Sequence, residues 1–514
     1  MYDDEPVNEP SGFQPGATTS SWAQISSEPT TGPAQNNTST LQRARHPKWV
    51  MPLVIVAAVA VVSSIAFAVQ SRAVVPQAAS PTPASSWTAT PTQPTPTPSR
   101  PTPTPSPTQS SPKPPLQRGP DYAWARAIGG SESDGFRQVA IAPDGTIVAV
   151  GFAGSSDGDF AENGAGDFVA MFAADGTLMW NRPPAEGIYW LTDVAVDQDG
   201  RIIVVGFERI DDGRKAVIIC LAPDGSLVWK TSLAASDPLD DSWAEFDGVA
   251  VDQDGSIVVV GMADGIRPDG DYGDIGPLDE DNGTCVLARF TSYGEQEWLT
   301  GVSHGTMQFW GIAIAPNGSI LLGGMSSTVK NDKGRYPPPI GAGFTQDGEL
   351  MWTRLIDGED ARLINVAVTP EGGMVAAKTL LSHLSRPRNP AGVASFTPDG
   401  DVAWFKPMTD WHDSPLAVDG FFDVAVTPAG QIVVVGDMEF PPNEQGYTAV
   451  ITSLTPDAGI NWTNTFRVGE NGQFRGVAVT PDGGIVAVGS TCSSDGDLPA
   501  LKGACDAVIV SINP

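Results

Sequence analysis

The sequence predicts an all-β fold, a seven-bladed β-propeller over residues 119–514, and three repeated features point to it. A triplet of the Val-Ala-Val type recurs seven times, with successive starts 53 to 63 residues apart. Most triplets are followed by a tight turn and a run of β-branched residues, which together indicate a β-hairpin. A second strand pair ends on tryptophan in most repeats. Four strands in each repeat are typical of a propeller blade.

The triplets mark the first strand of each repeat. They begin at Val139, Val194, Val249, Ile312, Val366, Val424 and Val477. The middle residue is always alanine, which we attribute to crowding where seven sheets converge. A Phe or Leu lies three positions before each triplet, and a large apolar residue repeated in this way predicts core packing rather than ligand contact. Asp-Gly and Asn-Gly pairs supply the positive φ that the hairpin turns need.

Both ends of the domain are expected to share one blade. The last repeat ends at Pro514 after only three strands. Trp124 lies ahead of the first repeat, in a segment that resembles the fourth strand beginning near Trp462. We therefore predict that an N-terminal strand closes the last blade, which removes an exposed sheet edge.

Residues 49–69 carry no charge and are long enough to cross a bilayer core of about 30 Å as a helix. Arg43, Arg45 and Lys48 precede this run, so the positive-inside bias predicts a single-pass transmembrane helix with a cytoplasmic N-terminus and an extracellular propeller. A cleaved signal peptide is the alternative, because Ala66-Phe67-Ala68 fits a cleavage site.

The segments on either side of residues 49–69 lack the apolar periodicity of a folded domain. Residues 1–48 are predicted to be a disordered cytoplasmic tail. Residues 70–118 are rich in Thr-Pro and Ser-Pro pairs, which favour an extended polyproline II stalk outside the cell. Dense Ser and Thr fit O-glycosylation, and a bare spacer is an equal alternative.

The net charge limits the kinds of partner that can bind, and the cysteines indicate the redox compartment. Residues 119–514 hold 22 Lys and Arg against 55 Asp and Glu, a net charge of −33. Such a surface repels phosphate backbones, so nucleic acid is excluded as a partner, and it attracts cations. Cys492 and Cys505 are predicted to form a disulfide in an oxidising compartment, whereas Cys220 and Cys285 are predicted to be buried free thiols.

The repeats resemble a family of bacterial surface β-propeller repeats with Trp, Gly-Gly-Ser, Ser-x-Asp-Gly-Asp and Gly-x-x-x-Trp elements. The first repeat carries them as Trp124, Gly129-Gly130-Ser131, Ser155-Ser156-Asp157-Gly158-Asp159 and Gly176-Thr177-Leu178-Met179-Trp180. The resemblance covers nearly all of 121–514. It implies a secreted or surface propeller of unassigned activity.

Acidic loops are the candidate metal sites. Asp157 with Asp159, and Asp495 with Asp497, offer hard oxygen ligands around a flexible glycine, which suits calcium. The acidic insertion at 264–281 is a further candidate. None of these loops follows the twelve-residue calcium motif, so solvated turn carboxylates are the alternative.

No catalytic set emerges from the motifs. The stretch 154–158 matches the Gly-x-Ser-x-Gly pattern of hydrolases, but a loop follows it where a helix would be needed, so we interpret the match as chance. None of the histidines at 304, 383 and 412 belongs to a His-Glu-x-x-His zinc motif.

Recognition is expected on the face that carries the long, variable loops. Aromatic residues that break the repeat are the candidate ligand contacts, with local packing as the alternative for each: Trp190, Trp310, Trp411 and Phe422. The sequence therefore predicts a membrane-anchored, surface-displayed, non-enzymatic binding or scaffold module for an extracellular glycan, peptide or cell-envelope component. The alternative is a glycan-processing or other propeller enzyme, which would need acidic side chains converging at the central channel.

Overall fold

The computed structural model describes residues 117–513 except for the following positions: 188, 211–212, 234–242, 264–283, 303–306, 327–337, 357–360, 381–390, 409–417, 440–446, 470–471, 494–495 and 500. The predicted tail, the transmembrane helix at 49–69 and nearly all of the stalk lie outside these residues. Within the described part of the chain, no helix is long and apolar enough to cross a membrane.

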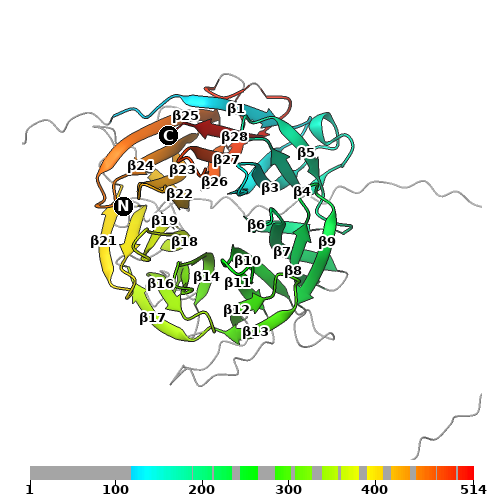
Figure 1. Ribbon diagram of the computed structural model, residues 1–514. Coiled ribbons are helices and arrows are strands. Elements are labelled where there is room, and N and C mark those ends of the chain that lie inside the picture. Colours follow the sequence, from blue (N-terminus) through cyan, green and yellow to red (C-terminus); the bar gives the residue numbers. More distant parts are fainter. Residues whose placement is uncertain are drawn as a thin grey trace, which may run out of the picture. The chain divides into compact units, whose positions relative to one another are not determined.

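The described chain is all-β, with 28 strands arranged in a ring (Figure 1). Seven inner strands lie nearest the axis: β2 (Asp134–Ile141), β6 (Tyr189–Val196), β10 (Ala244–Val251), β14 (Gln308–Ile314), β18 (Ala361–Val368), β22 (Val418–Val426) and β26 (Gln473–Val479). Each pairs antiparallel with a second strand: β3 (Ile147–Ala153), β7 (Ile202–Ile210), β11 (Ile257–Ala263), β15 (Ile320–Met325), β19 (Met374–Leu380), β23 (Ile432–Glu439) and β27 (Ile485–Thr491).

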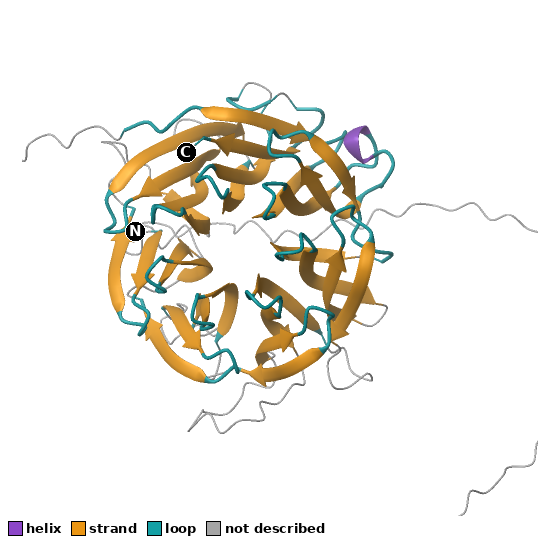
Figure 2. Ribbon diagram, in the orientation of Figure 1, coloured by secondary structure: helices purple, strands orange, loops and turns teal. Residues whose placement is uncertain are grey.

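Third and outer strands complete each unit. The third strands are β4 (Gly166–Phe172), β8 (Gly213–Leu221), β12 (Thr284–Phe290), β16 (Pro339–Phe344), β20 (Gly392–Phe396), β24 (Tyr447–Leu454) and β28 (Asp506–Ile512). The outer strands are β5 (Leu178–Arg182), β9 (Leu227–Leu233), β13 (Gln296–Gly301), β17 (Leu350–Leu355), β21 (Val402–Pro407), β25 (Ile460–Gly469) and β1 (Tyr122–Ile128). One turn of 3-10 helix, η1 (Gly158–Phe160), follows β3 (Figure 2).

The strands form five four-stranded sheets and one eight-stranded sheet, as expected for a β-propeller. The eight-stranded sheet contains β18 to β21 and β22 to β25, which join where Thr379 of β19 pairs with Gly420 of β22. The predicted closure is confirmed: β1 pairs antiparallel with β28, in a sheet of order β1-β28-β27-β26.

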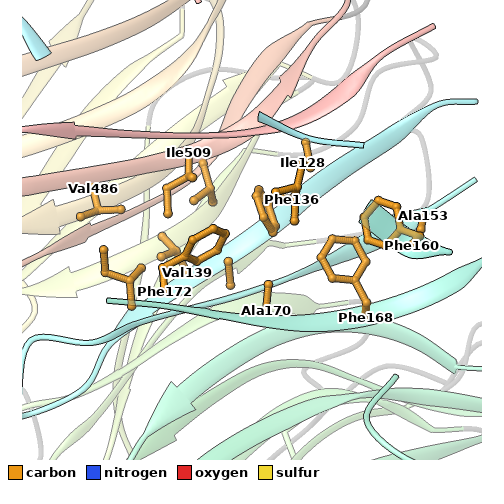
Figure 3. Close-up of a cluster of buried hydrophobic side chains, with 14 residues drawn as sticks. Ile128, Phe136, Val139, Ala153, Phe160, Phe168, Ala170, Phe172, Val486 and Ile509 are labelled. Carbon is orange, nitrogen blue, oxygen red and sulfur yellow. The ribbon is translucent and has the colours of Figure 1, made fainter. Parts of the chain in front are cut away.

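Apolar layers between neighbouring units form the core. In one cluster, Phe136, Phe168 and Phe172 of the first unit pack with Val486 and Ile509 of the last (Figure 3). The phenylalanine or leucine before each triplet is buried in this way in all seven inner strands. The core-packing interpretation of these residues is confirmed, and burial of such side chains drives the units together.

The repeated tryptophans on the outer strands also join neighbouring units. The indole Nε1 of Trp124 donates to the carbonyl oxygen of Ala174, and that of Trp180 donates to the carbonyl oxygen of Pro223. Both acceptors lie beside a hairpin turn of the next unit. The ring of Trp124 also lies so close to Gly176 that a Cβ there would approach it to 2.5 Å. The Asp-Gly turn is thus required both for its positive φ and for this contact.

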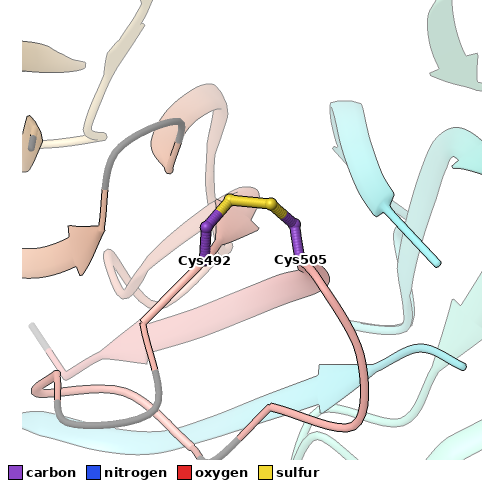
Figure 4. The surroundings of a disulfide bond; sticks show 2 residues. All are labelled: Cys492 and Cys505. Carbon is purple, nitrogen blue, oxygen red and sulfur yellow. A yellow bond between two sulfur atoms is a disulfide. The ribbon is translucent and has the colours of Figure 1, made fainter. Parts of the chain in front are cut away.

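A disulfide joins Cys492 to Cys505 beside the strands that close the ring (Figure 4). The sulfur atoms are 2.00 Å apart. Cys220 and Cys285 are buried free thiols. All three cysteine predictions are confirmed.

Candidate functional site

A β-bulge occurs at the same place in all seven inner strands. The extra residue comes directly after the buried Phe or Leu and is left out of the pairing with the second strand. We call these residues the axial ring: Arg137, Thr192, Asp247, Trp310, Ile364, Phe422 and Arg475. Bulges re-aim side chains and are frequent beside functional sites. The seven residues, of six different types, belong to the strands nearest the axis (Figure 1).

A close approach of the backbone accompanies the bulge. In six units the residue opposite the buried Phe or Leu is glycine, as Gly206 is opposite Leu191. Gly206 has φ +153°, and a Cβ on it would lie 1.9 Å from the carbonyl oxygen of Trp190. Only glycine fits such a contact without displacing the backbone. Lys378 takes this position in β19, opposite Leu363.

Two carboxyl groups next to the bulges are structural. Asp193 accepts hydrogen bonds from the amide of Val194 at 2.8 Å and from that of Val249, in the next unit, at 2.9 Å. Asp423 does the same with Val424 at 2.8 Å and Val477 at 2.7 Å. Burial raises the pKa of Asp193 to about 7 and that of Asp423 to about 8. Both side chains thus link neighbouring inner strands through backbone amides.

A second pair of carboxyl groups lies on β10. Glu245 and Asp247 flank the buried Phe246. Burial raises the pKa of Asp247 well above its usual value, and the charge of Glu245 raises it further. The Oδ2 atom of Asp247 has no hydrogen-bond partner. An unpartnered buried oxygen favours the protonated form of this group.

Glu245 differs from Asp247 because it has a cationic partner. Its Oε2 atom lies 2.9 Å from Nη1 of Arg214. The guanidinium of Arg214 in turn lies over the rings of Phe207 and Trp243, at 4.9 and 4.6 Å from their centroids. Burial raises the pKa of Glu245, and Arg214 opposes that rise. The two carboxyl groups of β10 thus have environments that separate their pKa values, a pattern of acid–base pairs in enzymes.

Three arginines on the inner strands stack on aromatic rings. Arg362 lies over Trp310 at 4.7 Å and Arg475 over Phe422 at 5.9 Å. Arg137 lies over Trp190 at 4.1 Å. Cation–π contacts of this kind hold the guanidinium plane in place.

Three of the four predicted ligand contacts are therefore on the inner strands. Trp310 and Phe422 belong to the axial ring, and Trp190 comes two residues before Thr192. The Trp190 ring is already contacted by Phe207, at 6.3 Å between centroids, and by Arg137. Trp411 lies outside the described residues.

The predicted metal ligands are held by the protein itself where the structure describes them. Asp157 accepts from the amide of Ser131 at 2.7 Å, and Asp159 accepts from the amide of Gly129 at 2.9 Å and pairs with Lys502. Asp497 accepts from the amide of Arg467 at 3.1 Å. Asp495 lies outside the described residues, as does the insertion at 264–281. Within the described part of the chain, no three His, Cys, Asp or Glu side chains gather as a metal site would need.

The serine of the hydrolase-like pattern is Ser156, which is exposed. Ser155, directly before it, is fully buried. Its Oγ atom donates to Asp134 at 2.8 Å and accepts from the amide of Glu132 at 2.9 Å. This serine organises the loop between β3 and η1. The structure thus explains Ser155 without a catalytic role.

Sequence reasoning missed Glu245, Asp247, Arg362 and Arg475. For Asp247 and Arg475 a signal was present, because the two residues between the buried Phe or Leu and the triplet change type from repeat to repeat. Glu245 and Arg362 lie one position before the buried residue, outside these two positions. Positions that vary inside a strict repeat are not explained by packing of the repeat. The bulge that leaves Asp247 and Arg475 out of the strand pairing is not visible in a period-two pattern.

No protein-family model and no curated protein matches the chain. Among solved structures it is similar to puromycin hydrolase, at 15% identity and a TM-score of 0.46, over 73% of this chain and 54% of that one. This chain therefore spans about half the length of puromycin hydrolase. A gluconolactonase of Xanthomonas campestris is 15% identical, with a TM-score of 0.35 over 62% of this chain and 93% of that one. The periplasmic gluconolactonase of Pseudomonas aeruginosa is 12% identical, with a TM-score of 0.41 over 65% and 86%.

These comparisons correct the predicted non-enzymatic binding or scaffold module. The three similar proteins named above are a hydrolase and two lactonases. The prediction searched for chemistry in loop motifs and did not consider the acidic pair on the inner strand β10. At such low identity the likeness concerns the fold, a propeller-like β-repeat, and transfers neither reaction nor substrate.

Proposed function

We propose that the chain is a glycan-processing enzyme whose active site lies on the inner strand β10. Asp247 acts as the general acid and Glu245 as the general base. The observation that carries this proposal is the pair itself. One carboxyl group has an unpartnered buried oxygen, and the other has an arginine partner at 2.9 Å. Two carboxyl groups in unlike environments are what glycosidic bond hydrolysis requires.

The chemistry follows from the two protonation states. Asp247, whose raised pKa favours the protonated form, gives its proton to the oxygen of the leaving sugar. Glu245, kept ionised by Arg214, takes a proton from the attacking water. Proton transfers of this kind each contribute about 10²- to 10⁴-fold in rate.

The test is cleavage of a panel of neutral and acidic oligosaccharides, measured as release of new reducing ends. We expect D247N and E245Q each to lower kcat at least about 100-fold. Asp347 lies in an exposed hairpin turn, so D347N is a matched control that should keep full activity. Full activity in D247N would overturn the proposal.

We also propose that the eight-stranded sheet counts as two blades, which gives seven blades of four strands. The spacing of the seven triplets supports this count. The helix at 49–69 and the stalk at 70–118 would hold the propeller outside the cell, where an extracellular glycan is available. Calcium at the Asp157 and Asp159 loop stays a prediction.

A further inference from the structure

The disulfide lies in the unit that both ends of the chain build together, from β26, β27, β28 and β1 (Figure 4). We call it the closing unit. Cys492 directly follows β27 and Cys505 directly precedes β28. Next to the bond, Thr491 of β27 pairs with Asp506 of β28. The disulfide therefore fastens one end of this strand pair.

The Cys492 end of the bond contacts the preceding unit through its outer strand, β25. The amide of Cys492 donates to the carbonyl oxygen of Val468 at 2.6 Å. Asp497 accepts from the amide of Arg467 at 3.1 Å. A Cβ on Gly496 would lie 2.3 Å from the carbonyl oxygen of Arg467, so the loop backbone packs directly against the strand. One side of the closing unit is thus held by contacts that begin at Cys492.

The Cys505 end contacts the first unit. The carbonyl oxygen of Cys505 accepts from the amide of Asp134, on β2, at 2.9 Å. The ammonium group of Lys502 pairs with Asp159. Asp159 also accepts from the amide of Gly129, directly after β1, at 2.9 Å. The other side of the closing unit, with the end of β1, is thus held by contacts that lead to Cys505.

The same hydrogen bond occurs at both junctions of the closing unit, and we call it the junction lock. In each lock, an aspartate accepts from the amide that lies five positions after the outer-strand tryptophan of the preceding unit. The aspartates are Asp159 and Asp497. Each is the last residue of a Ser-x-Asp-Gly-Asp pattern, which occurs twice in the sequence. Both copies of the pattern therefore serve the unit in which the ring is closed.

The cysteines differ in their access to a reductant. Cys492 and Cys505 are half-buried, whereas Cys220 and Cys285 are fully buried. Burial also raises the pKa of Cys220 to about 11 and that of Cys285 to about 12. Since the thiolate is the form that exchanges with disulfides, the two free thiols do not compete for the bond. A reductant in solution can thus act on this disulfide alone.

We propose that the disulfide is a redox-sensitive clasp, and that a dithiol reductant which opens it loosens both junctions of the closing unit. One thiolate of the dithiol attacks a sulfur atom of the bond, forms a mixed disulfide and releases the other cysteine. The second thiol then displaces the remaining cysteine. Cys492 and Cys505 gain two electrons and two protons, and the dithiol leaves as a disulfide.

The consequence for the ring follows from the position of the bond. While it is intact, the ends of β27 and β28 cannot separate. After reduction, only hydrogen bonds hold this end of the pair, so it can open locally and carry the contacts at Cys492 and Cys505 with it. The pairing of β28 with β1 lies next to this opening. The clasp acts independently of the acid–base pair on β10.

Hydrogen exchange of the full chain, followed by mass spectrometry, tests the clasp. On reduction with dithiothreitol we expect the amides of β1 and β28 to exchange at least about tenfold faster. Peptides of β10 and β11, in the third unit, should change by less than about twofold. Reoxidation should restore slow exchange in β1 and β28.

The variant C492S/C505S assigns the effect to this bond. Without reductant it should exchange as the reduced wild type does, and dithiothreitol should not change it further. Unchanged exchange of β1 and β28 in the reduced wild type would overturn the clasp, whether or not the variant folds. Equal acceleration in all units would also overturn it, because the bond would then stabilise the domain as a whole.

D159N tests the junction lock with the disulfide intact. Asparagine keeps the shape of the side chain but loses the charge that pairs with Lys502. We expect faster exchange of β1 in D159N than in the wild type. Glu162 is exposed in the same loop, so E162Q is the matched control and should leave the exchange unchanged. Equal exchange of β1 in D159N and E162Q would overturn the lock, and with it the route by which the bond acts on β1.

Discussion

Asp193 and Asp423 link neighbouring inner strands through their carboxyl groups, and their titration should make the stability of the ring depend on pH. Burial raises the pKa values of the folded state to about 7 and about 8, against about 3.9 for an aspartate in an unfolded chain. At pH values between the unfolded and the folded pKa values, Asp193 and Asp423 are protonated in the folded protein and ionised in the unfolded chain. The free energy of unfolding therefore falls as pH rises from about 4 to about 8.

Urea denaturation at pH 5 and pH 8.5 measures this slope. The double variant D193N/D423N should show a smaller difference between the two pH values than the wild type, whatever its absolute stability. All other titratable groups are common to both proteins, so the comparison isolates the contribution of Asp193 and Asp423. An identical pH dependence in the variant would mean that these carboxyl groups do not hold the extra protons.

Among single residues, the sequence predicted some members of the axial ring and missed others. Trp310 and Phe422 stood out because they break the repeat, and both belong to the axial ring. Asp247 and Arg475 occupy the same bulge position but are polar, and an isolated polar residue in a strand is usually solvated. Only the bulge, which needs the pairing register to be seen, reveals that these residues share one place.

At the scale of elements, the closing strand β1 is the feature whose removal should matter most. Its pairing with β28 covers a sheet edge, and Ile128 packs among Phe136, Ile509 and their neighbours. Deleting 119–128 would expose both that edge and that apolar surface. We expect the thermal unfolding midpoint to fall by several degrees, because each lost kcal/mol lowers it by about 2 °C or more.

The matched control is a deletion of equal length at 107–116, which precedes β1. It should leave the unfolding midpoint within about 1 °C of the wild type, since surface changes away from packed features have small effects. Equal midpoints for the two deletions would show that β1 does not close the ring.

The elements were predictable from the sequence because local and long-range signals agree in each repeat. The triplets fall on inner strands, the Asp-Gly turns on hairpins and Trp124 on the closing strand. A fold can be predicted from its sequence where turn chemistry, hydrophobic pattern and packing agree. The loops could not be predicted in this way, because their lengths follow no repeated pattern. The Ser-Ser-Asp-Gly-Asp loop resembled a metal site, but its Asp157 and Asp159 accept backbone hydrogen bonds.

At the scale of the whole molecule, the ring brings together residues that are far apart in the chain. Asp247 and Arg362 are separated by 115 positions, yet the charge of each acts on the other. The sequence alone cannot show this, because no local pattern links two inner strands across the axis.

The pH dependence of kcat for cleavage of an oligosaccharide is the most direct test of the acid–base pair. A general base works when ionised, so activity should fall as pH drops below the pKa of Glu245. A general acid works when protonated, so activity should also fall as pH rises above the raised pKa of Asp247. We predict a bell-shaped profile in the wild type and loss of the alkaline limb in the residual activity of D247N. An alkaline limb that persists unchanged in D247N would contradict the assignment of Asp247 as the acid.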